Sequence, residues 1–197
     1  MLPARETAEK ILDSSEKLNP GKWADHSRVA AACAGKIAAE DPEIDPDAAY
    51  VMGLLHDIGR RFGISHFRHI VDGYHYMAEL GYDDAARICL THSFPVKDIH
   101  TYLGRFDVPE TVVGEMGRIL RETDYDDYDR LIQLCDCLAM PDGVVNMSER
   151  MGDIARRYGR YPDSIRKANF ELKEYFEKKL HRNLYEVISD KKKLWGR

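Results

Sequence analysis

The residues with the clearest chemical meaning are His56 and Asp57, an imidazole and a carboxylate that stand side by side after a largely apolar segment, residues 51–55. Ionisable groups attached to a buried segment are costly unless a partner satisfies them. A metal ion is a suitable partner, because neutral imidazole and ionised carboxylate are both good ligands. The pair alone is better explained as a helix C-terminus with a favourable histidine and a solvated aspartate. The case for a metal therefore depends on other residues.

Four further residues are histidines or aspartates that stand beside apolar helical residues. They are His26, His69, His92 and Asp136. Asp136 is the most unusual of them, because it lies in the most apolar helical segment and carboxylates are rarely buried without a partner. Each histidine alone is better explained as a structural residue, and Asp136 alone as a buried hydrogen-bond acceptor. Because the set falls on different helices or helix ends, a single metal site inside a helical bundle explains it better.

The elements that must position these residues are helices, since an apolar period of helical type recurs along nearly the whole chain. The pattern predicts helices over residues 7–18, 23–40, 45–58, 70–80, 83–91, 96–103, 109–122, 128–139, 148–158 and 162–188. Gly59 is expected to end the helix that carries the His-Asp pair, with a basic loop over residues 59–66. A turn is expected at residues 141–143 and a frayed basic tail at residues 191–197. No strand pattern or repeat is visible. We therefore predict one all-α domain over residues 1–197, a helical bundle with a metal site in its interior.

Composition excludes several classes of protein. The chain has 197 residues, 44% of them hydrophobic and 32% charged, which suits one soluble domain with a sizeable core. The net charge of −5 disfavours a binder of large nucleic acids. No segment approaches the roughly 20 apolar residues of a membrane span, and the N-terminus lacks the apolar core of a signal peptide, so we expect a cytoplasmic protein without a membrane partner. The four cysteines form no Cys-x-x-Cys pair and are predicted to be reduced core residues: Cys33, Cys89, Cys135 and Cys137.

The order His26, then His56-Asp57, then Asp136 resembles the HD-domain superfamily of metal-dependent phosphohydrolases. Residues 54–59, Leu-Leu-His-Asp-Ile-Gly, are similar to the signature of that family. The resemblance implies an HD core over about residues 23–140, followed by C-terminal helices over about residues 147–190. It also implies that these four residues hold a metal ion.

A subset of the family has two more histidines between the His-Asp pair and the last aspartate, and these bind a second metal. His69 fits the first of them, because His69 and Gly73 make a His-x-x-x-Gly pattern, and His92 fits the second. Under this resemblance Asp57 bridges two ions. We expect iron, although manganese, zinc, cobalt or nickel would also suit these ligands. His66 and His75 are alternatives to His69, whereas His100 and His181 stand among polar residues and are predicted to lie at the surface.

The spacing is also similar to bacterial HD hydrolases that cleave diadenosine tetraphosphate symmetrically, in which a basic residue follows the His-Asp signature, as Arg60 does here. Tyr74 and residues 141–145 depart from the pattern of those enzymes, which concerns the substrate more than the metal site. The resemblance therefore implies a hydrolase that cleaves a nucleotide or a related small phosphoester with a metal-activated water. Asp57 and Arg60 would be the catalytic residues.

Phosphate could be bound by basic residues near the ligands in the sequence, although a solvated surface role competes for each of them. The candidates are Arg60, Arg61, Arg68, Lys97 and Arg130, with Arg60 preferred because it follows the pair directly. Two other functions stay open: a di-iron oxygenase of HD type, and a non-catalytic module that binds a metal and a nucleotide. A homodimer also stays open, since the last helix could pack on a second subunit, but core packing is the preferred use of its apolar face.

Overall fold

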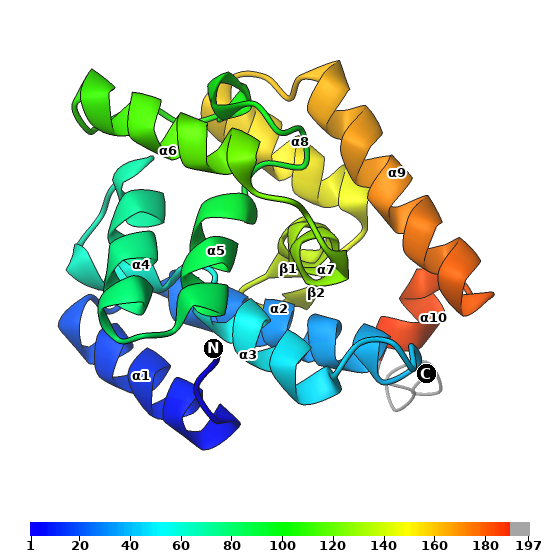
Figure 1. Ribbon diagram of the computed structural model, residues 1–197. Helices are drawn as coiled ribbons and strands as arrows, with labels where there is room; N and C mark the ends of the chain where they lie inside the picture. Colours follow the sequence, from blue (N-terminus) through cyan, green and yellow to red (C-terminus); the bar gives the residue numbers. More distant parts are fainter. Residues whose placement is uncertain (190–197) are drawn as a thin grey trace.

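The computed structural model describes residues 1–189 and is mostly helical in that part of the chain (Figure 1), which confirms the predicted all-α class. The elements are, in order, α1 Arg5–Leu18, α2 Lys22–Ala38, α3 Pro46–Leu55, the 3-10 helix η1 Ile58–Phe62, α4 Arg68–Glu79, α5 Asp83–Thr91, the 3-10 helix η2 Ile99–Thr101, α6 Glu110–Glu122, α7 Asp127–Asp136, β1 Ala139–Met140, β2 Gly143–Val144, α8 Met147–Tyr158, α9 Asp163–Leu180 and α10 Leu184–Ile188. No helix among the described residues is long and apolar enough to cross a membrane.

The centre of the molecule is the pair α2 and α3, which makes the most extensive helix contact, with α7 packed against both. Figure 1 shows α7 end-on at the centre, with α4, α5 and α6 on one side and α8, α9 and α10 on the other. The backbones of α2 and α3 approach closely because Gly53 lies against Ala31: a Cβ added to Gly53 would lie 2.8 Å from the Ala31 Cα. Small residues at this crossing bring the first histidine and the His-Asp pair toward each other.

A second close approach joins η1 to α4. Gly59 and Gly73 face each other, and a Cβ added to Gly59 would lie 1.9 Å from the His69 carbonyl oxygen and 2.5 Å from the Gly73 nitrogen. The prediction that Gly59 ends the preceding helix is wrong, because α3 ends at Leu55 and Gly59 lies within η1. The glycine is needed there for contact between two backbones.

Helix starts are fixed by side chains that the sequence places well. Asp45 accepts hydrogen bonds from Asp47 N and Ala48 N at the start of α3, and Pro46 occupies its first turn. Asp126 and Asp129 form a capping box at the start of α7. A cap therefore fixes the start of each helix, α3 and α7. Their C-terminal ends, which pack in the core, position His56, Asp57 and Asp136.

Several predicted boundaries need correction. The helix expected over residues 162–188 is broken after Leu180, because His181 adopts a left-handed conformation with φ 52° and α10 starts three residues later. Only η2 forms within residues 96–103, and the loop over residues 59–66 begins with η1.

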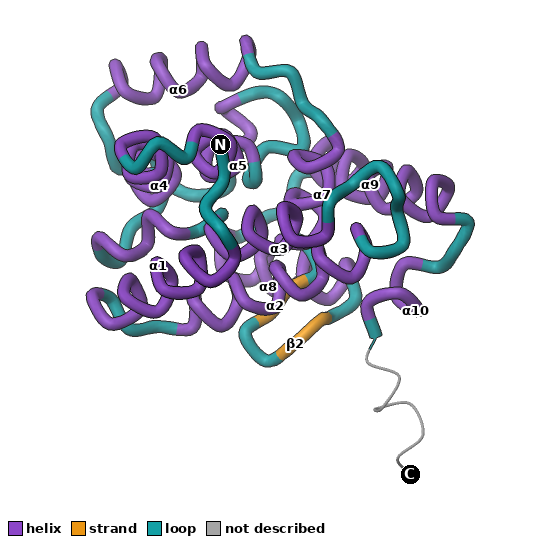
Figure 2. The backbone as a smooth tube through the Cα atoms, turned by 60° about the horizontal axis from the view of Figure 1, so that its bottom comes forward, coloured by secondary structure: helices purple, strands orange, loops and turns teal. Residues whose placement is uncertain are grey.

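Two short strands that the sequence did not indicate, β1 and β2, pair as a hairpin (Figure 2). Its turn is Pro141-Asp142, as the turn signal suggested, but α7 ends at Asp136 rather than Ala139. The predicted tail at residues 191–197 lies outside the described residues.

The apolar face of the last long helix is used in the core only in part, since Phe170 and Tyr175 are about two-fifths exposed. The last long helix, α9, buries Phe176 and Ile165 against the body of the chain. All four cysteines are buried and unpaired by disulfides, as expected of reduced core residues.

Candidate metal centre

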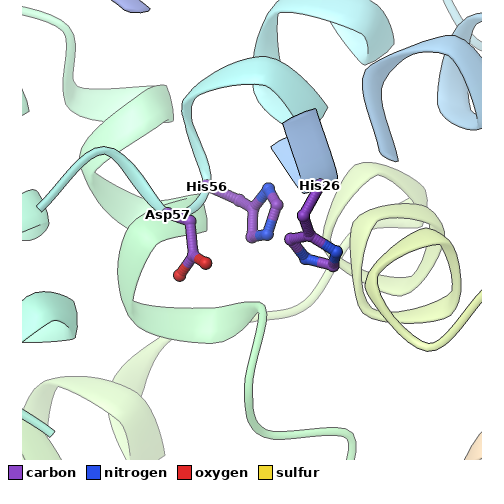
Figure 3. Close-up of side chains that lie close together, drawn as sticks. All are labelled: His26, His56 and Asp57. Atoms are coloured by element: carbon purple, nitrogen blue, oxygen red, sulfur yellow. The ribbon is translucent and has the colours of Figure 1, made fainter. Parts of the chain in front are cut away.

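The six predicted ligands come from the ends of four α-helices and from the first turns of a fifth, and these meet at one place. His26 lies in the first turns of α2, His56 directly follows α3 and precedes Asp57, His69 is in the first turn of α4, His92 follows α5, and Asp136 is the last residue of α7. Figure 3 shows the side chains of His26, His56 and Asp57 gathered between these elements. Helix ends suit this purpose because their side chains reach into the interior while the helix shafts pack around it.

One group of ligand atoms consists of His26, His56 and Asp57, which offer atoms within 4.8 Å of one another. Asp136 joins this side of the centre. Its Oδ1 lies 2.9 Å from His26 Nε2 and 4.0 Å from His56 Nε2. Three of the six candidate ligands are thus within reach of a single ion, and Asp136 adds a fourth donor beside them.

A second group consists of Asp57, His69 and His92, whose ligand atoms also lie within 4.8 Å of one another. Asp57 Oδ1 is 3.1 Å from His69 Nε2 and 3.7 Å from His92 Nε2. Asp57 is therefore common to both groups. The imidazoles form a continuous series, because the ring of His56 lies 5.0 Å from that of His92 and 5.2 Å from that of His26.

All four imidazoles are oriented in the same way: Nδ1 lies at a backbone carbonyl and Nε2 points to the centre. The carbonyl partners are Ala139 for His26 at 3.2 Å, Gly53 for His56 at 2.7 Å, His66 for His69, and Cys89 for His92 at 2.9 Å. Because a carbonyl only accepts, each Nδ1 carries the proton and donates it. In the neutral ring Nε2 then holds a free lone pair, which is the arrangement typical of metal-binding histidines.

The donor set is poorly satisfied without a cation. With Nδ1 protonated, a neutral His26 presents a lone pair to the Asp136 carboxylate at 2.9 Å, so that two acceptors face each other. His56 Nε2 and Asp57 Oδ1 are buried and have no hydrogen-bond partner. Unpartnered buried polar atoms are rare, and these two belong to residues of the clustered ligand groups, so they fit a metal ion.

Protonation states favour metal binding as well. Burial lowers the pKa of His56, and burial together with the nearby His56 lowers the pKa of His92 to about 3, so both rings are neutral at pH 7. Burial alone would raise the pKa of Asp57, but the charge of Arg60, joined by that of His69 when its ring also carries a proton on Nε2, outweighs burial and holds that pKa well below its ordinary value. Burial of Asp136 is likewise outweighed when His26 carries a proton on Nε2 and donates it to the carboxylate, so the pKa of Asp136 is lowered. Both carboxylates are ionised and available as ligands.

The centre opens into a cavity of about 440 Å³, whose wall includes His26, Asp57, His69, His92 and Asp136. Arg60 lies at its edge, where Nε donates to Asp57 Oδ2 at 2.6 Å and Nη2 lies 3.4 Å from His69 Nε2. Arg60 thus occupies Oδ2 of Asp57 and leaves Oδ1 facing His69 and His92.

The other predicted phosphate ligands do not line this cavity. The guanidinium of Arg61 lies over the Tyr76 ring, Arg68 donates to the Asp107 carbonyl, Lys97 lies over Tyr125, and Arg130 pairs with Asp127. The cations that do line it, besides Arg60, are Lys22, Arg150 and Arg157. Sequence reasoning missed them. The seven-residue spacing of Arg150 and Arg157 places them on one face of α8, but nothing in the sequence indicated that this face meets the cavity.

The remaining histidines are accounted for. His66 supplies its carbonyl to His69, and its ring lies 6.5 Å from Tyr158 rather than among the ligand atoms. His75 packs edge-on against Tyr74. His100 and His181 are exposed.

Comparison with known proteins agrees with this geometry. The family model described as "HD domain" matches residues 23–140, which is more than half of the chain. No curated protein and no solved structure shows significant similarity to the chain. HD domains are divalent-metal-binding members of a phosphohydrolase superfamily, and the match contains the five histidines and aspartates of the two ligand groups together with Asp136 beside them. The chain therefore belongs to the HD-domain family.

Proposed function

We propose that this HD domain binds two metal ions and hydrolyses a phosphoester or phosphoanhydride bond in a nucleotide or a substrate of similar size. One observation carries the proposal: Asp57 is shared by two groups of ligand atoms whose histidines all turn Nε2 inward. A shared carboxylate between two imidazole groups is the arrangement that a binuclear site requires. His26, His56, Asp57 and Asp136 would hold one ion, and Asp57, His69 and His92 the other.

Such ions, when bound, lower the pKa of a coordinated water and neutralise charge on phosphoryl oxygens. Iron is our first expectation, with manganese, zinc, cobalt and nickel as the other metals that suit these ligands. The chain itself contributes the orientation of the ligands through the four backbone carbonyls. It also contributes Arg60, which fixes the Asp57 carboxylate and carries a positive charge at the cavity edge.

The cavity supports a small-molecule substrate. Its volume of about 440 Å³ lies within the range of about 300–1,000 Å³ common for ligand pockets. Aromatic side chains from three parts of the chain, Trp23, Tyr102 and Tyr161, line it and could stack on a base. Diadenosine tetraphosphate is the first substrate to test, because of the similarity of the His-Asp segment and Arg60 to enzymes that cleave it.

The test begins with metal content measured by mass spectrometry on the wild type and on His69→Ala and His92→Ala. We expect about two ions per chain in the wild type and about one in each variant. His100→Ala is the matched control, because it removes an exposed imidazole outside the site. A single ion that is unchanged in both variants would contradict the second metal site.

A panel of nucleotides and phosphoesters then tests the reaction. Release of phosphate or of a nucleotide, lost in His56→Ala, would support hydrolysis. Aerobic oxidation of a substrate, together with a mixed-valence iron signal, would instead support a di-iron oxygenase. Tight nucleotide binding without turnover would support a binding module.

A further inference from the structure

Arg150 has a largely buried guanidinium in the wall of the cavity, and this group lacks close hydrogen-bonding oxygens. Its side chain is 13% exposed, and its Nε has no hydrogen-bond partner. The nearest carboxylate oxygens, Asp136 Oδ1 and Asp153 Oδ2, are each 3.7 Å away. Its Nη1 also lies 3.7 Å from the Met140 sulfur, which is a weak acceptor. A charged group in this position normally has several short hydrogen bonds.

The carboxylates around Arg150 are engaged by other residues. Asp153 accepts a hydrogen bond at 2.9 Å from Arg157 Nε and lies 3.5 Å from Arg156. Asp136 lies 2.9 Å from His26 and is one of the candidate metal ligands. Since neither carboxylate is free to bind Arg150 closely, a role as a structural counter-ion does not explain its burial. Its donors remain available to an anion in the cavity.

The position of Arg150 complements that of Arg60. Arg60 approaches the centre beside Asp57, from η1, whereas Arg150 approaches beside Asp136, from α8. Both line the same cavity. The charges of Arg60 and Arg150 balance those of the Asp57 and Asp136 carboxylates. Bound metal ions would therefore give this part of the cavity a net positive charge, which attracts an anionic substrate. A guanidinium also matches the oxygens of a phosphate in a two-pronged geometry.

We propose that Arg150 binds the non-bridging oxygens of the substrate phosphate, which lies between Arg150 and Arg60 at the metal centre. The inference rests on the proposed function, in that it assigns a specificity-determining residue to that reaction. It concerns phosphate recognition and can be tested with inorganic phosphate alone.

The experiment measures the dissociation constant of inorganic phosphate by isothermal titration calorimetry at constant ionic strength, with metal content recorded for each sample. Arg150→Gln is compared with the wild type, with Arg150→Lys and with Arg156→Gln. Arg156 is the matched control, because it is an arginine of α8 that is 73% exposed and lies outside the cavity wall.

We expect Arg150→Gln to weaken phosphate binding about 10- to 100-fold, which corresponds to the loss of one or two charge-assisted hydrogen bonds. Arg150→Lys should bind with intermediate affinity, because it keeps the charge but not the planar geometry. Arg156→Gln should bind as the wild type does, and metal content should be unchanged in all three variants. If Arg150→Gln does not fold, the comparison of Arg150→Lys with the wild type decides.

Wild-type affinity in Arg150→Gln, an equal loss in Arg156→Gln, or no phosphate binding by the wild type would overturn the inference. The two proposals can fail separately. Phosphate binding that depends on Arg150, without turnover of any phosphoester, would refute the proposed hydrolysis and leave this inference standing. Turnover of a phosphoester with a KM that is unaffected by Arg150→Gln would support the proposed hydrolysis and refute this inference.

Discussion

Replacing Gly59 by alanine should disrupt one half of the metal centre more than the other. The added Cβ would lie 1.9 Å from the His69 carbonyl oxygen and 2.5 Å from the Gly73 nitrogen. Ordinary contact requires about 3.5 Å, so α4 and η1 must separate by about 1.5 Å. Both close atoms belong to the backbone, and no side-chain rotation can relieve the contact. His69 is on α4, and Asp57 precedes η1, so the separation acts directly on the distance between these two ligands.

The expected magnitudes follow from this geometry. Overpacking of a buried contact costs about 1–3 kcal/mol, and we expect about 3 kcal/mol here because backbone must move. A displacement of about 1 Å in a preorganised site can reduce activity by about 100-fold. Gly59→Ala should therefore lose the ion held by Asp57, His69 and His92, and should retain most of the ion held by His26 and its neighbours.

The assay combines urea unfolding with metal analysis by mass spectrometry. Gly114→Ala is the matched control, because a Cβ at Gly114 meets no atom within 4 Å and alanine is the better helix former, so stability should rise by about 1 kcal/mol. Gly53→Ala is the complementary variant, since its Cβ would press on Ala31 and separate α2 from α3, which acts on the His26 side. If Gly59→Ala kept wild-type stability and both ions, the reasoning would be refuted.

Three further predictions concern stability. Lys179→Met should lower the free energy of unfolding by about 2 kcal/mol at pH 7. Lys179 Nζ lies 2.7 Å from a carboxylate oxygen of Asp127 and 2.8 Å from one of the buried Asp41, and solvent screens part of this attraction. Burial opposes the ionisation of Asp127, but the hydrogen bond from Lys179 holds its pKa below the ordinary value. The difference in stability between variant and wild type should therefore persist from pH 7 to 5 and shrink on acidification below about pH 4. A difference that grew on acidification would contradict this reasoning. Asp129→Ala should lower the free energy of unfolding, measured by chemical denaturation, by about 3 kcal/mol. Asp129 is fully buried and accepts hydrogen bonds from Arg87 at 2.8 Å and Thr91 at 2.7 Å. A loss below about 1 kcal/mol would argue against the importance of this network. Chelation of metal should lower the melting temperature by about 5–10 °C, as expected for a ligand present at about 100 times its dissociation constant; an unchanged melting temperature would contradict tight metal binding by the folded state.

Much of the fold could be predicted because its signals are local. The apolar period identifies most helices, and the caps at Asp45 and Asp126 act within three residues of the chain. The errors occur where tertiary contacts decide. The sequence pattern predicts that Gly59 ends a helix, but Gly59 lies within η1, where the close contact with the α4 backbone leaves no room for a side chain. The strands β1 and β2 have two residues each, which is too short to show an alternating apolar pattern. The helix break at His181 depends on a left-handed backbone conformation at a residue other than glycine.

The sequence by itself determined the ligand types, because histidines and aspartates beside apolar helical residues need partners, and the order of His26, His56-Asp57 and Asp136 is a property of the chain. That Asp57 is shared by two groups is implied by the family resemblance, but the residue pattern alone does not determine it, since it depends on five separate elements converging in the tertiary structure. Only the tertiary structure decided which cations face the cavity. Arg61, Arg68, Lys97 and Arg130 are near ligands in sequence but point elsewhere, whereas Arg150 is distant in sequence from most ligands and lies 3.7 Å from Asp136. Sequence proximity does not determine which wall of a cavity a side chain joins, because that depends on how whole helices pack.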